Sequence, residues 1–368
     1  MAAVLIATNK CDGIYQFRKE VVSALLAAGY SVVLSSPYDR TADYFRDLGC
    51  TFVETPLSRH GTNPVRDLGL LSFYRSLLKK YRPVCVLTYT IKPNVYMGMA
   101  CASAHVPYLC NVTGLGVSLQ KKGLLRGISL FLYRRGLRRA ARVFFQNQEN
   151  CDFMTSQGVV RAPVTVLPGS GVNLAEHSPR PYPESGNGVT ILYVGRFMVD
   201  KGMEEYGAAA ARLKAAHPDV RILAVGKPEE EYRARWEEIV AEGAVTDCGT
   251  TDRIDDYYAQ AHIVCMPSYH EGMNNVLLEA CASARPVVTT DVPGCREACE
   301  DGVNGFLCRP ADADDLYEKL EKMTGMVNSR RAEMGRCSRK LVEERFDRQT
   351  VVSAYMEAVR AAAGAGAL

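Results

Sequence analysis

The sequence predicts an α/β protein of two domains, each an open parallel sheet covered by helices. Its 368 residues exceed what one hydrophobic core usually serves. Short runs rich in Val, Ile and Leu alternate with amphipathic runs from end to end, which is typical of parallel sheets with helical connections. Residues 178–188 hold three prolines and two glycines without hydrophobic periodicity, which indicates a linker. We therefore expect domains at 1–177 and 189–346, and a C-terminal helix over 347–368 that packs back on the first domain.

In the first domain, each expected strand is a short apolar run bounded by turn residues. Between the first two runs, Ile14, Phe17, Val21 and Leu25 recur at helical spacing and Gly29 follows as a stop. This arrangement predicts a strand-turn-helix unit at the start of the chain. The expected strands are 3–8, 31–36, 50–55, 84–90, 107–113, 142–147 and 163–168.

The second domain repeats this alternation of strands and helices, with one helix over 203–218. Ligands of open α/β sheets bind outside the carboxyl ends of the strands, so we expect the functional site in a cleft between the domains. The expected strands are 189–195, 221–226, 262–268, 286–290 and 305–308.

Composition narrows the class of protein. With 47% hydrophobic and 23% charged residues, the chain is typical of a soluble globular protein, and no apolar run reaches the roughly 18 residues of a membrane-spanning helix. The opening run MAAVLIAT predicts a buried strand and not a signal peptide. Thirteen cysteines without a Cys-x-x-Cys spacing indicate reduced, mostly buried thiols in a cytoplasmic protein.

Charge is distributed unequally between the two halves. Residues 1–177 hold 21 Lys and Arg against 10 Asp and Glu, whereas the remainder holds 23 against 31. This asymmetry predicts that the two domains bind different partners.

The segment HEGMNNVLLEA (270–280) places two glutamates on either side of a helix start. Asparagine is a favoured N-cap residue, so a helix is expected to begin at Asn274 or Asn275, with Gly272 leaving the preceding loop open. The N–H groups of Met273, Asn274 and Asn275 would then form an anion site at the positive end of the helix dipole. Glu271 would lie at this site, and Glu279 in the second turn would accept hydrogen bonds from hydroxyls. Taken singly, each glutamate also fits an ordinary surface charge.

A second segment, YVGRFMVDKG (193–202), supplies cations. A buried strand stops at Gly195, Arg196 follows at once, and Lys201 precedes the next helix. An Arg and a Lys that face the helix start at Gly272 would hold a diphosphate by charge-assisted hydrogen bonds.

Together these residues resemble the signature of family-four glycosyltransferases, which are retaining enzymes with two Rossmann-like domains facing each other across a cleft, the GT-B fold. The resemblance implies that Arg196 and Lys201 neutralise the donor diphosphate, Glu279 holds the ribose, and Glu271 contacts the donor sugar with Met273, Asn274 and Asn275. It further implies that Gly195, Gly226, Lys227 and Gly272 border the nucleotide, and that Gly13 lies in the loop that presses on the donor.

No metal or other cofactor is expected, because Arg, Lys and N–H groups would stabilise the charge that develops on the leaving diphosphate. Asp312 and Asp314 have the spacing of a metal-binding pair, but they precede an amphipathic run and are expected to cap its helix. The catalytic base stays open. His270 adjoins Glu271, and Lys10 in the first loop is either a further cation or a solvated side chain.

The runs TYTIKPNVYMG (88–98) and NVTGLG (111–116) are similar to the subgroup that builds bacterial capsule, O-antigen and lipid-linked oligosaccharides. This similarity implies an acceptor site at Lys92, Asn94, Asn111 and Thr113, with Lys92 meeting an acceptor phosphate; the alternative is a simple loop with a turn.

Residues 121–142 hold eight Lys and Arg and no acid, interleaved with apolar residues. Such a stretch fits the interface of an anionic membrane, with Arg134, Arg135, Arg138 and Arg139 as contacts. The alternative is a helix that covers the sheet and has a solvated basic face. Nucleic acid is not expected as a partner, because aromatic residues are few here and Trp236 lies in the other half.

The sequence therefore predicts a cytoplasmic, peripherally membrane-associated glycosyltransferase that moves a hexose or N-acetylhexosamine from a UDP-sugar to a polyprenyl-diphosphate-linked or other glycan. One alternative is a UDP-sugar epimerase of similar architecture, which needs acid and base residues on both faces of the sugar. Another is a sugar-binding protein without turnover. A dinucleotide oxidoreductase is not expected, because the first loop lacks Gly-x-Gly-x-x-Gly.

Overall fold

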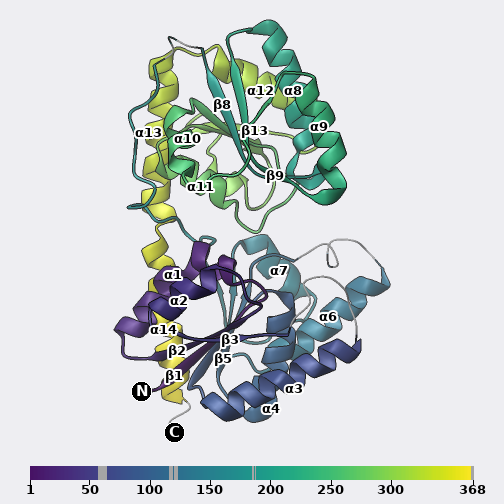
Figure 1. Ribbon diagram of the computed structural model, residues 1–368, viewed down its shortest axis with the longest axis vertical. Coiled ribbons are helices and arrows are strands. Elements are labelled where there is room, and N and C mark those ends of the chain that lie inside the picture. Colours follow the sequence, from purple (N-terminus) through teal and green to yellow (C-terminus); the bar gives the residue numbers. More distant parts are fainter. Residues whose placement is uncertain (57–63, 116–118, 120–122, 185, 187, 366–368) are drawn as a thin grey trace. The chain divides into compact units, whose positions relative to one another are not determined.

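The computed structural model describes residues 1–56, 64–115, 119, 123–184, 186 and 188–365, and the chain divides into two compact units (Figure 1). The first unit comprises Met1–Ser170 and Gln349–Leu368, and the second comprises Gly171–Arg348. The proline-rich segment thus lies inside the second unit and not between the two. The segment is held there by a side chain and by its backbone, since Tyr182 Oη donates to the carbonyl of His262 at 2.6 Å and Asn328 Nδ2 donates to the carbonyl of Pro183 at 2.8 Å.

The first unit is built on a seven-stranded parallel sheet in the order β3-β2-β1-β4-β5-β6-β7. Alternate residues of β1 enter opposite cores, Val4 and Ile6 on one face and Leu5 and Ala7 on the other, as expected for a sheet covered on both faces. The strands are β1 (Ala3–Ala7), β2 (Ser31–Ser36), β3 (Thr51–Glu54), β4 (Cys85–Tyr89), β5 (Tyr108–Val112), β6 (Arg142–Phe145) and β7 (Val164–Val166).

Two helix layers cover this sheet (Figure 1). On one face lie α1 (Cys11–Ala27), α2 (Thr41–Asp47) and α14 (Arg348–Ala365); on the other lie α3 (Pro64–Tyr81), η1 (Pro93–Met97), α4 (Gly98–Ala104) and α6 (Leu124–Leu137), with α7 (Gln148–Ser156) near the end of the sheet. The C-terminal helix α14 buries Val351, Tyr355 and Val359 in the same core as α1. Its apolar face is therefore covered by the first unit.

The second unit contains a six-stranded parallel sheet in the order β10-β9-β8-β11-β12-β13. The two-residue strand β10 was not expected from the sequence, because Thr246 and Asp247 are polar and do not form an apolar run. They pair with Leu223 and Ala224 of β9. The strands are β8 (Thr190–Phe197), β9 (Arg221–Pro228), β10 (Thr246–Asp247), β11 (Ile263–Met266), β12 (Val287–Thr290) and β13 (Gly305–Cys308). The helices are η3 (Val199–Lys201), α8 (Met203–Ala216), η4 (Glu230–Tyr232), α9 (Arg233–Ala241), α10 (Ile254–Gln260), α11 (Asn275–Ala282), η5 (Arg296–Ala298), α12 (Ala313–Thr324) and α13 (Asn328–Arg345).

Two glycines allow β8 and β9 to continue side by side to their carboxyl ends. Gly195 and Gly226 are register partners, and both have positive φ, 149° and 151°. A Cβ on Gly226 would lie 1.7 Å from the carbonyl oxygen of Gly195, so only glycine fits. This contact sets the position of the residue that follows each glycine within its strand, Arg196 in β8 and Lys227 in β9.

All thirteen cysteines are free. In the described part of the chain, no helix combines the length and the apolar character needed to cross a membrane.

Candidate functional site

The loops that follow β8 and β11 are joined to each other at the carboxyl edge of the second sheet. The N–H of Tyr269 donates to the carbonyl of Asp200 at 3.0 Å. Gly202 has φ +71°, and a Cβ there would lie 2.1 Å from the carbonyl oxygen of Pro267. Because the two backbones are this close, η3 holds Lys201 directly against the loop that leads into α11.

Lys201 forms an ion pair at this loop. Its Nζ contacts Glu271 Oε1, and Asn274 Nδ2 donates to the same oxygen at 3.3 Å. The side chains of Lys201 and Glu271 are only 19% and 16% exposed, so solvent screens this pair weakly. Gly294 approaches the loop from the far side, because a Cβ on it would lie 2.7 Å from Glu271 Cβ. The backbone and Cβ of Glu271 are therefore held close to Gly294.

The helix α11 begins as the sequence predicted, with Asn274 as its N-cap. The side chain of Asn274 accepts a hydrogen bond from the N–H of Leu277 at 3.2 Å. Its own N–H, however, donates to the carbonyl of Gly294 at 2.7 Å, so the prediction of a free N–H at Asn274 was wrong. Met273 is buried in the core, whereas the buried Oδ1 of Asn275 accepts no hydrogen bond from the described residues.

Arg196 forms an ion pair with Glu229, which follows β9, and its facing the start of α11 stays a prediction. Its Nη1 lies 2.7 Å from Glu229 Oε1, with the two side chains 58% and 39% exposed. Glu229 is fixed next to Arg196 because its N–H donates to the carbonyl of Phe197 at 3.1 Å. The adjacent Lys227 is exposed. The parallel register of β8 and β9 brings Arg196 opposite Lys227, and Glu229 follows Lys227 by two residues.

Glu279 lies in the second turn of α11 and is held by a buried tyrosine. Tyr258 Oη donates to Glu279 Oε2 at 2.9 Å, and Tyr258 itself is inaccessible to solvent. Burial raises the pKa of the Glu279 carboxyl, although the neighbouring His177, the hydrogen bond from Tyr258 and the charge of Arg348 oppose this rise. The role of Tyr258 was not predicted from the sequence. A tyrosine on the apolar face of a helix looks the same in the sequence whether it only packs in the core or also donates a hydrogen bond to a carboxylate.

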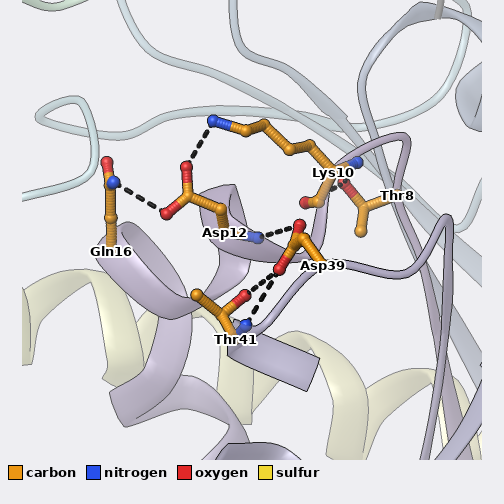
Figure 2. Close-up of polar contacts among 6 residues, drawn as sticks. All are labelled: Thr8, Lys10, Asp12, Gln16, Asp39 and Thr41. Carbon is orange, nitrogen blue, oxygen red and sulfur yellow. Dashed lines mark hydrogen bonds and ion pairs between the residues drawn. The ribbon is translucent and has the colours of Figure 1, made fainter. Parts of the chain in front are cut away.

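The first loop of the first unit is fixed by carboxylates (Figure 2). Lys10 Nζ forms an ion pair with Asp12, whose other oxygen accepts from Gln16 Nε2 at 2.8 Å. Asp39 accepts from the N–H groups of Asp12 and Thr41, both at 3.1 Å, and so connects the starts of α1 and α2. Lys10 is thus a paired side chain in this structure.

Gly13 lies in the first turn of α1 and not in an extended loop. A Cβ at this position would meet no other atom within 4 Å. No neighbour therefore requires glycine there, and its contact with a donor stays a prediction.

Two of the predicted acceptor residues are structural. Asn94 and Asn111 are 0% and 2% exposed. Asn94 accepts from Thr88 Oγ1 at 2.7 Å and donates to the carbonyl of Asn111 at 2.6 Å. Asn111 donates to the carbonyl of Thr88 at 3.1 Å and accepts from Tyr355 Oη. Because both amide groups are used inside the unit, the prediction that they contact an acceptor was wrong.

Lys92 and Thr113, the other two, are half-buried and follow β4 and β5 at the carboxyl edge of the first sheet. Asp312 caps α12, because its side chain accepts from the N–H of Asp315 at 2.9 Å. Among the described residues, no cluster of three His, Cys, Asp or Glu side chains could hold a metal ion. His270 is half-buried in the loop before α11.

The basic stretch forms α6, and one side of this helix covers the sheet with buried residues such as Tyr133 and Leu137. Its other side exposes Leu125, Ile128 and Phe131 at 65%, 47% and 53%. Four exposed arginines, the ones predicted from the sequence to contact a membrane, lie in the last turn of α6 or just after it: Arg134, Arg135, Arg138 and Arg139. Lys121 and Lys122 lie outside the described residues.

Each of the two units matches a known protein family. Residues 12–169 match the profile described as glycosyl transferase 4-like domain, and residues 188–325 match glycosyl transferases group 1. The chain is 28% identical to a Campylobacter jejuni N,N'-diacetylbacillosaminyl-diphospho-undecaprenol alpha-1,3-N-acetylgalactosaminyltransferase, over 83% of this chain and 85% of that protein. It is 29% identical to the capsular polysaccharide biosynthesis glycosyltransferase CapM of Staphylococcus aureus, over 44% of this chain and 43% of CapM.

Solved structures share the fold. The structure of Anabaena HepE in complex with UDP and glucose superposes with a TM-score of 0.81 at 17% identity, covering 98% of this chain and 100% of that one. Sucrose-phosphate synthase from Thermosynechococcus elongatus gives 0.78 at 20% identity, covering 99% and 100%. Both units thus have the Rossmann-like architecture of GT-B proteins.

Proposed function

The chain belongs to the glycosyltransferases, with a 4-like first domain and a group 1 second domain, and from this premise we propose that it transfers a hexose or N-acetylhexosamine from a UDP-sugar to a lipid-linked glycan with retention of configuration. The observation that carries the proposal is Lys201, a half-buried cation fixed at the start of α11 beside Glu271. The UDP donor is supported by the UDP in the HepE complex.

Lys201 and Arg196 bind the donor diphosphate in this proposal. Each cation has a carboxylate partner, Glu271 or Glu229, and the diphosphate competes with that partner for the charge. When the bond between the sugar and the diphosphate breaks, negative charge grows on the leaving group. Cations already fixed near that group stabilise the transition state more than the bound substrate, and this difference lowers the barrier.

Glu279 binds the ribose in the same proposal. Tyr258 occupies its Oε2, and no described residue hydrogen-bonds its Oε1, which is therefore the acceptor for a ribose hydroxyl. Glu271, Met273, Asn274 and Asn275 border the donor sugar, and the unpaired Oδ1 of Asn275 accepts a sugar hydroxyl. Gly195, Gly226, Lys227 and Gly272 border the nucleotide.

The reaction needs no metal ion in this scheme, because lysine and arginine supply the positive charge. The leaving diphosphate itself takes the proton of the acceptor hydroxyl, so that the new glycosidic bond forms on the face that the diphosphate leaves. Full activity in the presence of EDTA is the expected result, and loss of activity restored by Mg²⁺ would contradict this part of the proposal.

The acceptor is a glycan on a polyprenyl diphosphate, and the enzyme works at the cytoplasmic face of an anionic membrane. The lipid-linked acceptor is supported by the activity for which the Campylobacter relative is named. Membrane association is supported by α6, where exposed apolar side chains and arginines share one helix. Lys92 and Thr113, at the carboxyl edge of the first sheet, contact the acceptor.

A panel of UDP- and other nucleotide-linked hexoses and N-acetylhexosamines tests the proposal. Each donor is incubated with the enzyme, with and without a polyprenyl-diphosphate glycan, and free nucleoside diphosphate is measured. We expect one UDP-sugar to be turned over, faster with the lipid-linked glycan, and the NMR spectrum of the product to show the donor's anomeric configuration. Turnover of a different nucleotide, or an inverted product, would overturn the corresponding part of the proposal.

A further inference from the structure

Two adjoining hollows, lined by arginine and lysine, open on the outer surface of α3, α4 and α6. One has a volume of about 280 Å³ and includes Arg75, Arg135, Arg138 and Arg139 in its lining. The other has about 340 Å³ and includes Arg75, Lys79 and Arg82. Because they share Arg75, we treat them as one site, the basic hollow, defined by these six cations.

The hollow exists because the middle helix is short and carries mostly small side chains. Helix α4 has the sequence GMACASA, so it forms a low floor between the longer side chains of α3 and α6, its neighbours on this face (Figure 1). Two glycines bring α6 against this floor. A Cβ on Gly98 would lie 2.3 Å from the carbonyl oxygen of Gly136, and one on Gly136 would lie 2.6 Å from that of Asn94.

The end of α6 is also anchored to the sheet. Tyr108 Oη donates to the carbonyl of Gly136 at 2.9 Å and accepts from the N–H of Arg139 at 3.1 Å. The guanidinium of Arg139 donates to the carbonyl of Ala102 at 3.3 Å. The backbone that carries the α6 arginines is therefore fixed next to α4 before any ligand arrives.

The six cations lack acidic partners. Residues 68–82, 98–106 and 125–141 contain no Asp or Glu, and among the described residues none of the six forms an ion pair with a carboxylate. Cations near helix C-termini interact favourably with the helix dipole. This interaction explains why Lys79 and Arg138 are stable at their positions without acidic partners. Arg75 lies farther inside α3 and is shared by both hollows, so the dipole does not account for it. A site of concentrated positive charge remains, and it favours an anion.

The hollow is separate from the expected acceptor site. Arg82 and Val106 precede β4 and β5, so the hollow lies toward the amino-terminal edge of the sheet, whereas Lys92 and Thr113 follow the same strands at the carboxyl edge. Exposed Leu125, Ile128 and Phe131 lie on α6, N-terminal to Arg135 and Arg138. Apolar side chains beside clustered cations fit a bilayer with anionic headgroups.

We propose that the basic hollow binds the phosphate of an anionic phospholipid headgroup, while the exposed apolar residues of α6 enter the adjoining acyl region. The guanidinium groups of Arg75 and Arg138 bind phosphate oxygens by paired, charge-assisted hydrogen bonds. This inference rests on the proposed membrane association, to which it adds a defined headgroup site.

The test compares two double variants of equal charge in the full-length protein. Arg75→Gln with Arg138→Gln changes the hollow; Lys80→Gln with Arg134→Gln removes exposed cations from the same two helices outside it. Flotation with phosphatidylcholine vesicles that contain phosphatidic acid is measured at fixed ionic strength. Calorimetry with short-chain phosphatidic acid and with inorganic phosphate then separates a lipid headgroup from free phosphate. Transfer to a soluble glycan monitors the fold and the active site.

We expect the control variant to lose no more than about tenfold in vesicle affinity, and the hollow variant to lose at least about tenfold beyond the control, with transfer to the soluble glycan unchanged in both. Equal losses would overturn the headgroup site and leave membrane association standing. A wild-type protein that binds no vesicle would overturn both, while donor turnover would still report on the transferase proposal. Binding of inorganic phosphate as tight as that of the lipid, or of a DNA oligonucleotide in place of vesicles, would overturn the assignment to lipid.

Discussion

The two units differ in whether the cations of their proposed sites are paired with carboxylates. In the second unit, Lys201 and Arg196 each contact a carboxylate, Glu271 and Glu229 respectively. In the first unit, the cations of the basic hollow have no carboxylate partner among the described residues. A paired cation attracts little from afar and becomes available only to a ligand that outcompetes its partner. An unpaired cluster attracts anions over the length of a Debye screening distance, about 8 Å in physiological salt.

This difference suits a small diphosphate ligand in one unit and an extended anionic surface in the other. A nucleotide must be bound, cleaved and released, so a carboxylate that reclaims the cation after the reaction favours release. A membrane surface needs attraction without such exchange. Four changes would break or sharpen this comparison, and they follow from the largest expected free-energy effect to the smallest.

Replacement of Lys201 by Met removes the half-buried cation and nearly keeps the length of the side chain. We expect kcat/KM for the donor to fall by about 10²–10³-fold, because a fixed charge at the leaving diphosphate is lost. Steady-state kinetics with the preferred donor measures it. Lys340→Met, which changes an exposed lysine of α13, is the control, and an equal effect of both variants would show that Lys201 has no special role.

Acid is expected to weaken the second unit through His262. This histidine is 3% exposed, its Nδ1 accepts from the N–H of Thr190 at 3.1 Å, and burial lowers its pKa to about 4. Because the pKa in the folded state lies below the unfolded value of about 6.5, stability is lost as the pH falls from about 6.5 toward 4, by up to about 3 kcal/mol.

Urea unfolding at pH 7 and pH 4 measures this loss. His262→Gln keeps an acceptor for the N–H of Thr190 and cannot titrate in this range, so its loss of stability between the two pH values should be smaller than that of the wild type. The same loss in both proteins would show that other groups govern acid unfolding.

Tyr258→Phe removes the hydroxyl that holds Glu279. We expect the donor KM to rise by about three- to tenfold with kcat nearly unchanged, which corresponds to one hydrogen bond to a charged group. In a protein that already carries Glu279→Gln, the same change should have no further effect on KM. If the two effects simply add, Tyr258 does not act through Glu279.

Glu229→Gln frees Arg196 from its partner. Since exposed ion pairs contribute at most about 1 kcal/mol, UDP should bind about two- to fivefold more tightly at low salt, and the gain should vanish at high salt. Calorimetry with UDP measures it. Glu230→Gln, which affects only the exposed pair with Arg233, should leave UDP binding as it was, and a tighter complex in both variants would point to overall charge instead.

Much of the fold could be predicted because most strands are short apolar runs and most helices have an apolar face. The start of α11 at Asn274 and the position of Lys201 likewise follow from local signals: a favoured N-cap and a glycine that must lie against Pro267. The two-residue strand β10 has no such signal. Residues 178–188 were predicted to be a linker because prolines and glycines are common both in linkers and in irregular segments that pack on the surface of a domain.

Several contacts of the predicted site residues join segments that are distant in the sequence. An asparagine at the end of a strand looks the same in the sequence whether it meets a ligand or a neighbouring strand, and Asn111 is held by Tyr355, 244 positions away. Glu229 lies 33 positions from Arg196. Arg75 gave no signal, because the basic hollow forms only where Gly98 and Gly136 bring α4 and α6 together.

The central claim is that Lys201 and Arg196 exchange their carboxylate partners for a diphosphate. A crystal structure of the complete protein with UDP tests it most directly. The account predicts diphosphate oxygens within hydrogen-bond distance of Lys201 Nζ and of the Arg196 guanidinium, with the ion pair between Arg196 and Glu229 broken. A complex in which both ion pairs are intact and the diphosphate lies elsewhere would contradict it.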